Sequence, residues 1–100
     1  MGPQPGTDWY LSTLMKFFYV YVLYNASENF IYIGYSENLK QRIQEHNEGK
    51  VKSTKAYAPL KLIFYEAYPT KSDAKRREIY LKSNKGRTTL MMMLKDFFSK

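Results

Sequence analysis

The chain has 100 residues, of which 44% are hydrophobic and 17% aromatic, which is enough for one packed core and excludes a disordered chain. It has no cysteine and one histidine, which excludes disulfides, cysteine zinc sites and clusters of histidine ligands. Its net charge of +7 favours a nucleic acid as partner, with an anionic membrane surface second. No apolar run approaches the roughly 20 residues of a membrane-spanning helix. No secretory signal is recognised at the start either, so a cytoplasmic location is expected.

Two strands are predicted near the start of the chain. Residues 1–14 contain prolines and glycines without a periodic pattern, and we expect them to form a flexible extension ahead of one domain over residues 15–100. The run FFYVYVLY at 17–24 is β-branched and aromatic on both faces, which predicts a strand buried on both sides. A second strand is predicted over 29–35. The polar loop 25–28 joins the two strands in a hairpin.

A helix is predicted to follow the hairpin and to end near Glu48. Ser36 or Asn38 can cap its first turn, and Gly49 suits the position after its last turn. Its inward face carries three side chains at helical spacing: Leu39, Ile43 and His46.

A basic connection over residues 50–59 is expected to be mobile, and the run LKLIFY at 60–65 predicts a third strand. A further helix is predicted over 73–84. Ser72 can cap its start, and Gly86 suits the position after its end.

The last predicted helix runs from a cap at Thr88 through Phe98. The elements then follow one another in the order β-β-α-β-α-α. This order predicts an α+β fold in which a three-stranded antiparallel sheet is flanked by helices.

The tyrosines of the hairpin are the first candidate site residues. With a loop over 25–28, Tyr21 is expected opposite Tyr32, so that both hydroxyls emerge from the same face of the sheet. Gly34 shares that face and leaves room for the backbone or a substrate to approach. Tyrosine is also a common strand residue, so simple packing of the two rings is the alternative interpretation.

Arg42 and His46 are the second candidate pair, because a spacing of four residues makes them neighbours on a helix. Both are expected along the seam between the helix and the sheet. A guanidinium offers a planar fork to phosphate oxygens, and a neutral imidazole can accept or relay a proton. A purely structural role for the histidine is the alternative.

Glu78 falls in the middle of the inward stripe of the helix predicted over 73–84. A carboxylate there must be paired or must hold a cation, because burying it alone is costly. Ion pairs with Lys75 or Lys82 are one interpretation, and one Mg²⁺ or Mn²⁺ ion held with water and substrate phosphate is the other. The other acidic residues of this region are scattered, which predicts a single metal ion.

Taken in order, these features resemble the motifs of the GIY-YIG nuclease superfamily. The first two motifs correspond to residues 19–21 (YVY) and 32–34 (YIG), and the arginine, histidine and glutamate follow in later helices. The segment LKSNKGR at 81–87 resembles the small, single-domain bacterial members. The resemblance covers about residues 16–97 and implies a nuclease domain, of the kind found in homing endonucleases, some restriction enzymes and the incision subunit of nucleotide excision repair.

The resemblance implies a metal-dependent DNA endonuclease domain that uses one Mg²⁺ or Mn²⁺ ion. It assigns the catalytic roles to Tyr21, Tyr32, Arg42 and His46, and metal binding to Glu78. We expect these five side chains to converge on one concave, solvent-accessible patch.

Basic residues outside this set are expected to bind the DNA backbone with little readout of sequence, and a protein partner could supply the targeting. These residues are Lys50, Lys52, Lys55, Lys75, Arg76 and Arg77. A catalytically weak or inactive nucleic-acid-binding module of the same fold is the alternative function. A domain that binds protein through exposed tyrosines is a third.

Overall fold

The computed structural model describes residues 16–99, so the extension predicted over residues 1–14 lies outside the described residues. In chain order the elements are β1 (Phe18–Asn25), β2 (Phe30–Ser36), α2 (Leu39–Asn47), the short 3-10 helix η1 (Lys55–Tyr57), β3 (Lys61–Tyr68), α3 (Lys71–Lys82), α4 (Asn84–Met93) and α5 (Lys95–Phe98). The predicted α+β class and element order are confirmed, with the last helix divided in two. No helix within residues 16–99 is long and apolar enough to cross a membrane.

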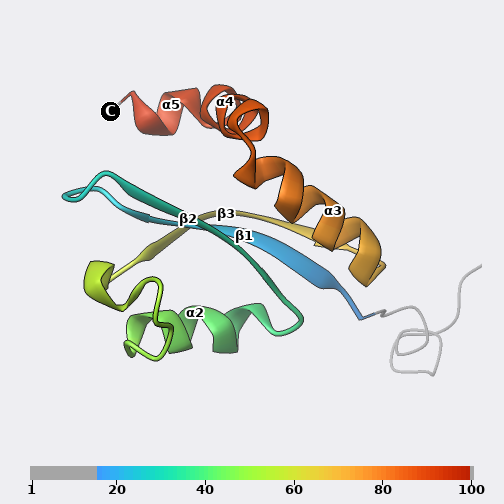
Figure 1. The fold of residues 1–100 in the computed structure, drawn as a ribbon, viewed down its shortest axis with the longest axis horizontal. Coiled ribbons are helices and arrows are strands. Elements are labelled where there is room, and N and C mark those ends of the chain that lie inside the picture. The colour runs from blue at the N-terminus through green and yellow to red at the C-terminus, as the bar shows by residue number, and fades with distance from the viewer. Residues whose placement is uncertain (1–15, 100) are drawn as a thin grey trace, which may run out of the picture.

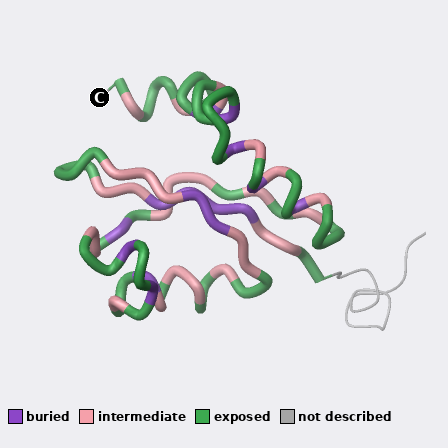
Figure 2. Tube along the Cα trace, in the orientation of Figure 1, coloured by how far each residue is buried: buried purple, intermediate pink, exposed green. Residues whose placement is uncertain are grey.

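The three strands form one antiparallel sheet in the order β2-β1-β3, with β1 in the middle. Helix α2 and η1 lie on one side of the sheet, and α3, α4 and α5 lie on the other (Figure 1). The middle of β1 is buried from Val20 to Leu23, as the purple segment in Figure 2 shows. This burial on both faces follows from the central position of β1 between two helical layers.

The hairpin register differs from the predicted one by two residues. Tyr21 pairs with Gly34, and Tyr32 pairs with Leu23, so Tyr21 does not lie opposite Tyr32. The reason is the turn, which occupies residues 26–29 and ends at Asn29 in a left-handed conformation with φ 50°. Since the shift is an even number of residues, both tyrosines still lie on the same face of the sheet.

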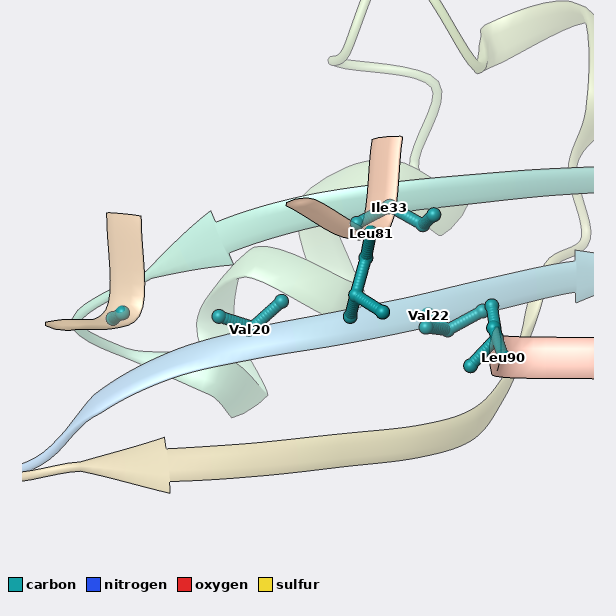
Figure 3. Packing of buried hydrophobic residues seen from close by; sticks show 6 residues of the cluster. Val20, Val22, Ile33, Leu81 and Leu90 are labelled. Atoms are coloured by element: carbon teal, nitrogen blue, oxygen red, sulfur yellow. The ribbon is translucent and has the colours of Figure 1, made fainter. Parts of the chain in front are cut away.

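The main hydrophobic core fills the space between the sheet and helices α3 and α4. Val20 and Val22 of β1 and Ile33 of β2 pack against Leu81 and Leu90 (Figure 3). Full burial of an aliphatic side chain of this size contributes about 1.5–3 kcal/mol, so this layer supplies much of the stability. A smaller cluster lies on the α2 face of the sheet, and its buried members are Tyr21, Leu23 and Leu60.

Helix α3 begins earlier than predicted because Thr70, not Ser72, is its cap. The Thr70 Oγ1 atom accepts a hydrogen bond of 3.2 Å from the backbone N–H of Asp73. The Thr70 hydroxyl also donates to the Asp73 carboxylate at 2.6 Å, so the two side chains stabilise the first turn together. The shift leaves Glu78 on the buried side of the helix.

Gly86 lies inside α4, so the prediction that it follows the end of α3 is wrong. Ser83 separates the two helices and caps α4, because its Oγ accepts from the backbone N–H of Gly86 at 3.0 Å. Thr88 is therefore not a cap. A Cβ atom at Gly86 would overlap the Tyr80 carbonyl oxygen and lie 2.7 Å from Leu81 Cα, so glycine lets α4 turn closely against the end of α3.

The connection over residues 50–59 is held against α2, contrary to its expected mobility. Val51 and Thr54 are buried, and η1 forms the second half of the connection. The Asn47 side chain also binds the backbone of Leu60 twice, donating to its carbonyl at 3.0 Å and accepting from its N–H at 2.6 Å. Composition alone does not reveal that this connection is ordered, because its three lysines suggest an exposed, mobile segment.

Replacing Gly86 with alanine tests the close contact between α3 and α4. Alanine is about 1 kcal/mol more favourable than glycine in an open helix, so without an overlap Gly86→Ala would stabilise the protein. We expect the opposite sign, a loss of about 1–3 kcal/mol in the free energy of unfolding, because a methyl group must fit where backbone already lies. Urea unfolding measures this difference.

The matched control is Lys85→Ala, an exposed position in the same turn of α4. Its effect should stay within about 0.5 kcal/mol. A stabilised Gly86→Ala protein would show that the two helices do not approach this closely.

Candidate active site

A buried hydrogen bond between Tyr21 and His46 joins the sheet to α2. The Tyr21 hydroxyl lies 2.7 Å from His46 Nε2, and both residues are completely buried. The end of the Tyr21 ring lies over Gly34, where an added Cβ would overlap the ring and the hydroxyl. The space that glycine leaves on β2 is therefore filled by the phenol of the protein itself.

Tyr32 and Arg42 lie beside this pair and face outward. The Tyr32 ring is half-buried, with its centroid 4.9 Å from that of His46 and 6.3 Å from that of Tyr21. Arg42 donates to Glu45 at 3.0 Å and keeps 38% of its side chain exposed. The structure thus brings four of the predicted residues together, but only Tyr32 and Arg42 are open to solvent.

Burial raises the pKa of Tyr21 to about 12, with a further increase from Tyr32 and a partly opposing effect from the Arg42 guanidinium. Free phenolate is therefore scarce at neutral pH. Tyr21 can take a proton from another molecule only if it passes its own proton on at the same time. Its hydrogen-bond partner, His46, is the group placed to receive it.

Burial also lowers the pKa of His46, and the nearby positive charge of Arg42 lowers it further, against a smaller effect of Glu45. The imidazole is consequently neutral near pH 7. A neutral ring has one nitrogen without a proton, so His46 can accept one.

Glu78 comes from α3, a helix on the other side of the sheet from α2 (Figure 1). Its two carboxylate oxygens bind Lys75 at 3.1 Å and Lys82 at 3.0 Å, so both of the ion pairs considered from the sequence are present. Its negative charge nevertheless contributes to the raised pKa of Tyr21 and of Tyr35. The charge of this carboxylate therefore acts on the tyrosine cluster, although Glu78 comes from a helix on the other side of the sheet.

The donor chemistry of Glu78 fits one hard divalent cation. A single carboxylate supplemented by water and substrate phosphate is a common way to hold Mg²⁺. Two lysine ammonium groups now neutralise this buried carboxylate, and one dication would supply the same charge. No group of three or more His, Asp or Glu side chains suited to a metal occurs among the described residues.

The predicted backbone-binding residues lie on both sides of the sheet. Lys52 and Lys55 are exposed in the connection after α2, and neighbouring Lys50 pairs with Glu48 at 3.0 Å.

The three predicted backbone-binding residues of α3 are all paired. Lys75 binds Glu78, and Arg76 binds Asp73 at 2.9 Å. Arg77 donates twice to Glu66 of β3, at 2.9 and 3.2 Å, so its fork is the least available of the six to a phosphate.

Thr54 is a site residue that the sequence did not indicate. It is completely buried, and its Oγ1 lies 2.7 Å from His46 Nδ1. A single threonine in a lysine-rich connection carries no periodic or motif signal, and only the folding of that connection onto α2 reveals it.

An antiparallel sheet whose first two strands bring tyrosines to an arginine and a histidine of the next helix is characteristic of nuclease-type GIY-YIG domains. The family profile described as "GIY-YIG catalytic domain" matches residues 17–91, and the chain belongs to this family.

Its relatives include small bacterial proteins. UPF0213 protein SH2523 of Staphylococcus haemolyticus is 38% identical over 76 residues, which cover 75% of this chain and 92% of the relative. A UPF0213 protein of Pediococcus pentosaceus is 34% identical over 86% of this chain and 90% of its own length. UPF0213 protein YazA of Bacillus subtilis is 40% identical over 72% of this chain and 71% of its own length.

The lowered pKa of His46 predicts that acid destabilises the fold. An unfolded histidine has a pKa of about 6.5, whereas the buried His46 resists protonation. The stability that depends on neutral His46 is therefore complete above about pH 6.5. As the pH falls from there toward the native pKa, it declines by up to about 1.4 kcal/mol per pH unit. Urea unfolding at a series of pH values measures this slope.

His46→Gln is the control, because the chain has one histidine. This variant should lose the part of the slope between about pH 6.5 and pH 5, where most carboxylates are still ionised. An equal slope in the variant would assign the pH dependence to other groups.

Proposed function

We propose that this domain is a metal-dependent DNA endonuclease that hydrolyses phosphodiester bonds with one divalent ion, Mg²⁺ or Mn²⁺. Its membership of the GIY-YIG family supports a nuclease-type activity on nucleic acid. The observation that carries the proposal is the 2.7 Å contact between the Tyr21 hydroxyl and His46 Nε2, with Arg42 beside it. A proton donor, a proton acceptor and a phosphate-binding cation occupy one cluster.

Arg42 is the residue that meets the scissile phosphate. Its present ion pair with Glu45 is partly exposed to water and is worth at most about 1 kcal/mol. A phosphate can therefore replace Glu45 without a large loss of stability. Bound in this way, the guanidinium stabilises the negative charge that develops on the phosphoryl oxygens.

Tyr21 and His46 together accept the proton that the attacking water loses. Their hydroxyl and imidazole are covered in the free protein, and Tyr32 and Arg42 are the accessible neighbours through which the water enters. Tyr21 takes a proton from the water while it gives its own to His46, which avoids a free phenolate. Tyr32 holds the water in place by a hydrogen bond from its hydroxyl.

Glu78 would hold the divalent ion, exchanging its two lysine partners for it. GIY-YIG nucleases generally use such an ion, which neutralises charge on the phosphate when bound. Release from Glu78 also leaves Lys75 and Lys82 available to the DNA backbone.

A catalytically weak or inactive nucleic-acid-binding module is the second candidate function. The double ion pair of Glu78 and the complete burial of Tyr21 favour it, because both groups are engaged within the protein. In either case a protein partner could supply targeting to a particular DNA structure.

Two conservative substitutions separate these functions. Glu78→Gln should abolish cleavage, because it removes the charge that holds the ion, while DNA binding without metal stays intact. Tyr21→Phe removes only the hydroxyl and should slow cleavage by about 10²–10⁴-fold. Cleavage of a panel of nicked, branched, single-stranded and duplex DNA with Mg²⁺ or Mn²⁺ is the measurement.

Glu48→Gln is the matched control, since it removes a carboxylate from an exposed ion pair with Lys50. It should cleave like the unmodified protein. Full activity of a folded Glu78→Gln protein would remove Glu78 from the site and favour the binding module.

Binding to DNA should weaken steeply with salt because lysine contacts release counterions from phosphates. Replacing Lys50, Lys52 and Lys55 together with alanine should reduce the slope of log affinity against log salt by roughly two to three units. Fluorescence anisotropy with labelled DNA over a range of salt concentrations measures the slope.

The comparison variant replaces Lys85 and Lys95, which are exposed in α4 and α5 on the other side of the sheet. Their loss should change the slope less. An unchanged slope in the triple variant would place the connection after α2 away from the DNA.

A further inference from the structure

The buried hydroxyl of Thr54 has no part in the chemistry described so far. It lies at the end of a chain of contacts that begins at Tyr21. The Tyr21 hydroxyl is 2.7 Å from His46 Nε2, and Thr54 Oγ1 is 2.7 Å from His46 Nδ1. Beyond Thr54 lies the carbonyl oxygen of Val51, at 3.5 Å. All three polar side chains are completely buried, so no bulk water competes for these bonds.

Hydrogen-bond accounting distinguishes the two neutral forms of His46. If Nδ1 carries the proton, it donates to Thr54, the Thr54 hydroxyl donates to the Val51 carbonyl, and Tyr21 donates to Nε2. Each donor then has an acceptor. If Nε2 carries the proton, it donates to the Tyr21 oxygen, and the Tyr21 proton has no acceptor in a hydrogen bond among the described residues.

Arg42 favours the same form. A guanidinium can only donate, and Arg42 lies beside the Tyr21 hydroxyl, where its charge lowers the pKa of Tyr21. The Tyr21 proton therefore points away from Arg42 and toward His46. That direction requires a His46 Nε2 without a proton.

The backbone of the connection after α2 holds Thr54 in this position. The backbone N–H groups of Thr54 and Lys55 both donate to the Val51 carbonyl, at 3.1 and 2.9 Å, and Tyr57 N–H donates to the Thr54 carbonyl at 2.8 Å. The Thr54 side chain is thus fixed by a tight turn against α2.

We propose that Thr54 is a positioning residue that holds neutral His46 with its proton on Nδ1, so that Nε2 accepts the proton of Tyr21. The assignment of the proton concerns the free protein, and the use of Nε2 in catalysis rests on the proposed nuclease function. Thr54 itself touches neither substrate nor metal.

The proton balance of the hydrolysis follows from this assignment. The water oxygen forms a bond to phosphorus and gives one proton to the Tyr21 oxygen, while the Tyr21 proton moves to His46 Nε2. The phosphorus bond to the leaving oxygen breaks, and that oxygen takes a proton from solvent. His46 is then doubly protonated, and its Nδ1–H still donates to Thr54. Return of the proton through Tyr21 to solvent restores the starting state.

Nitrogen NMR of the imidazole tests the proton position without DNA or metal. Because the chain has one histidine, ¹⁵N-labelled protein gives one pair of ring signals, and both belong to His46. Above the ordinary histidine pKa of about 6.5, we expect Nδ1 to show the shift of a protonated nitrogen and Nε2 that of an unprotonated one. The reverse pattern in the unmodified protein would overturn the proposal, whatever its activity.

Three variants then test the role of Thr54. Thr54→Val keeps the shape and removes the hydroxyl, so Nδ1 should lose its preference for the proton and cleavage should slow roughly 10- to 100-fold. Thr54→Ser keeps the hydroxyl and should preserve both the NMR pattern and most of the activity. Ser53→Ala, an exposed neighbour, should change neither.

The failure of this proposal and that of the nuclease function are distinguishable. A Thr54→Val protein with an unchanged NMR pattern overturns the role of Thr54, even if it cleaves DNA. If Thr54→Val does not fold, the unmodified protein and Thr54→Ser still decide the proton position. An unmodified protein with the expected NMR pattern but no cleavage of any DNA overturns the catalytic use of Nε2, together with the nuclease function.

Discussion

The hydrogen bond between Tyr21 and His46 is the interaction on which the candidate site depends. It joins the central strand to α2 in an environment without solvent, where an unpartnered hydroxyl or imidazole would be costly. Such a pair is stable only if the remaining polar atoms are also satisfied. Thr54 satisfies the other ring nitrogen, which explains why the connection after α2 must fold tightly onto the helix.

The edge strand β2 makes this arrangement possible. Its glycine, Gly34, lets the Tyr21 phenol lie across the strand, and its tyrosine, Tyr32, makes an edge-type contact with the histidine ring. Arg42 then occupies the rim of the cluster, where it remains charged and accessible. A buried pair of hydrogen-bonded side chains and a partly exposed guanidinium therefore lie next to each other in this part of the domain.

The two faces of the sheet carry different kinds of residues. The face under α3 and α4 carries the aliphatic core, and it also holds Glu78 between two lysines. The face under α2 carries the polar cluster. Because β2 is an edge strand, charges on the two faces still influence each other, as the contribution of Glu78 to the pKa of Tyr21 illustrates. A nucleic acid bound along this edge would contact both sides of the sheet.

The sequence by itself determined the element order, the α+β class and four of the residues that gather on the α2 face, because alternation, helical spacing and family motifs are local signals. It did not determine the hairpin register, since the left-handed Asn29 sets the turn, nor the place of Gly86, which depends on how closely α4 approaches α3. Only the tertiary structure revealed Thr54 as the partner of His46 and the position of Glu78 in a helix on the other side of the sheet from α2. Such facts depend on contacts between segments far apart in the chain, and no local pattern encodes them.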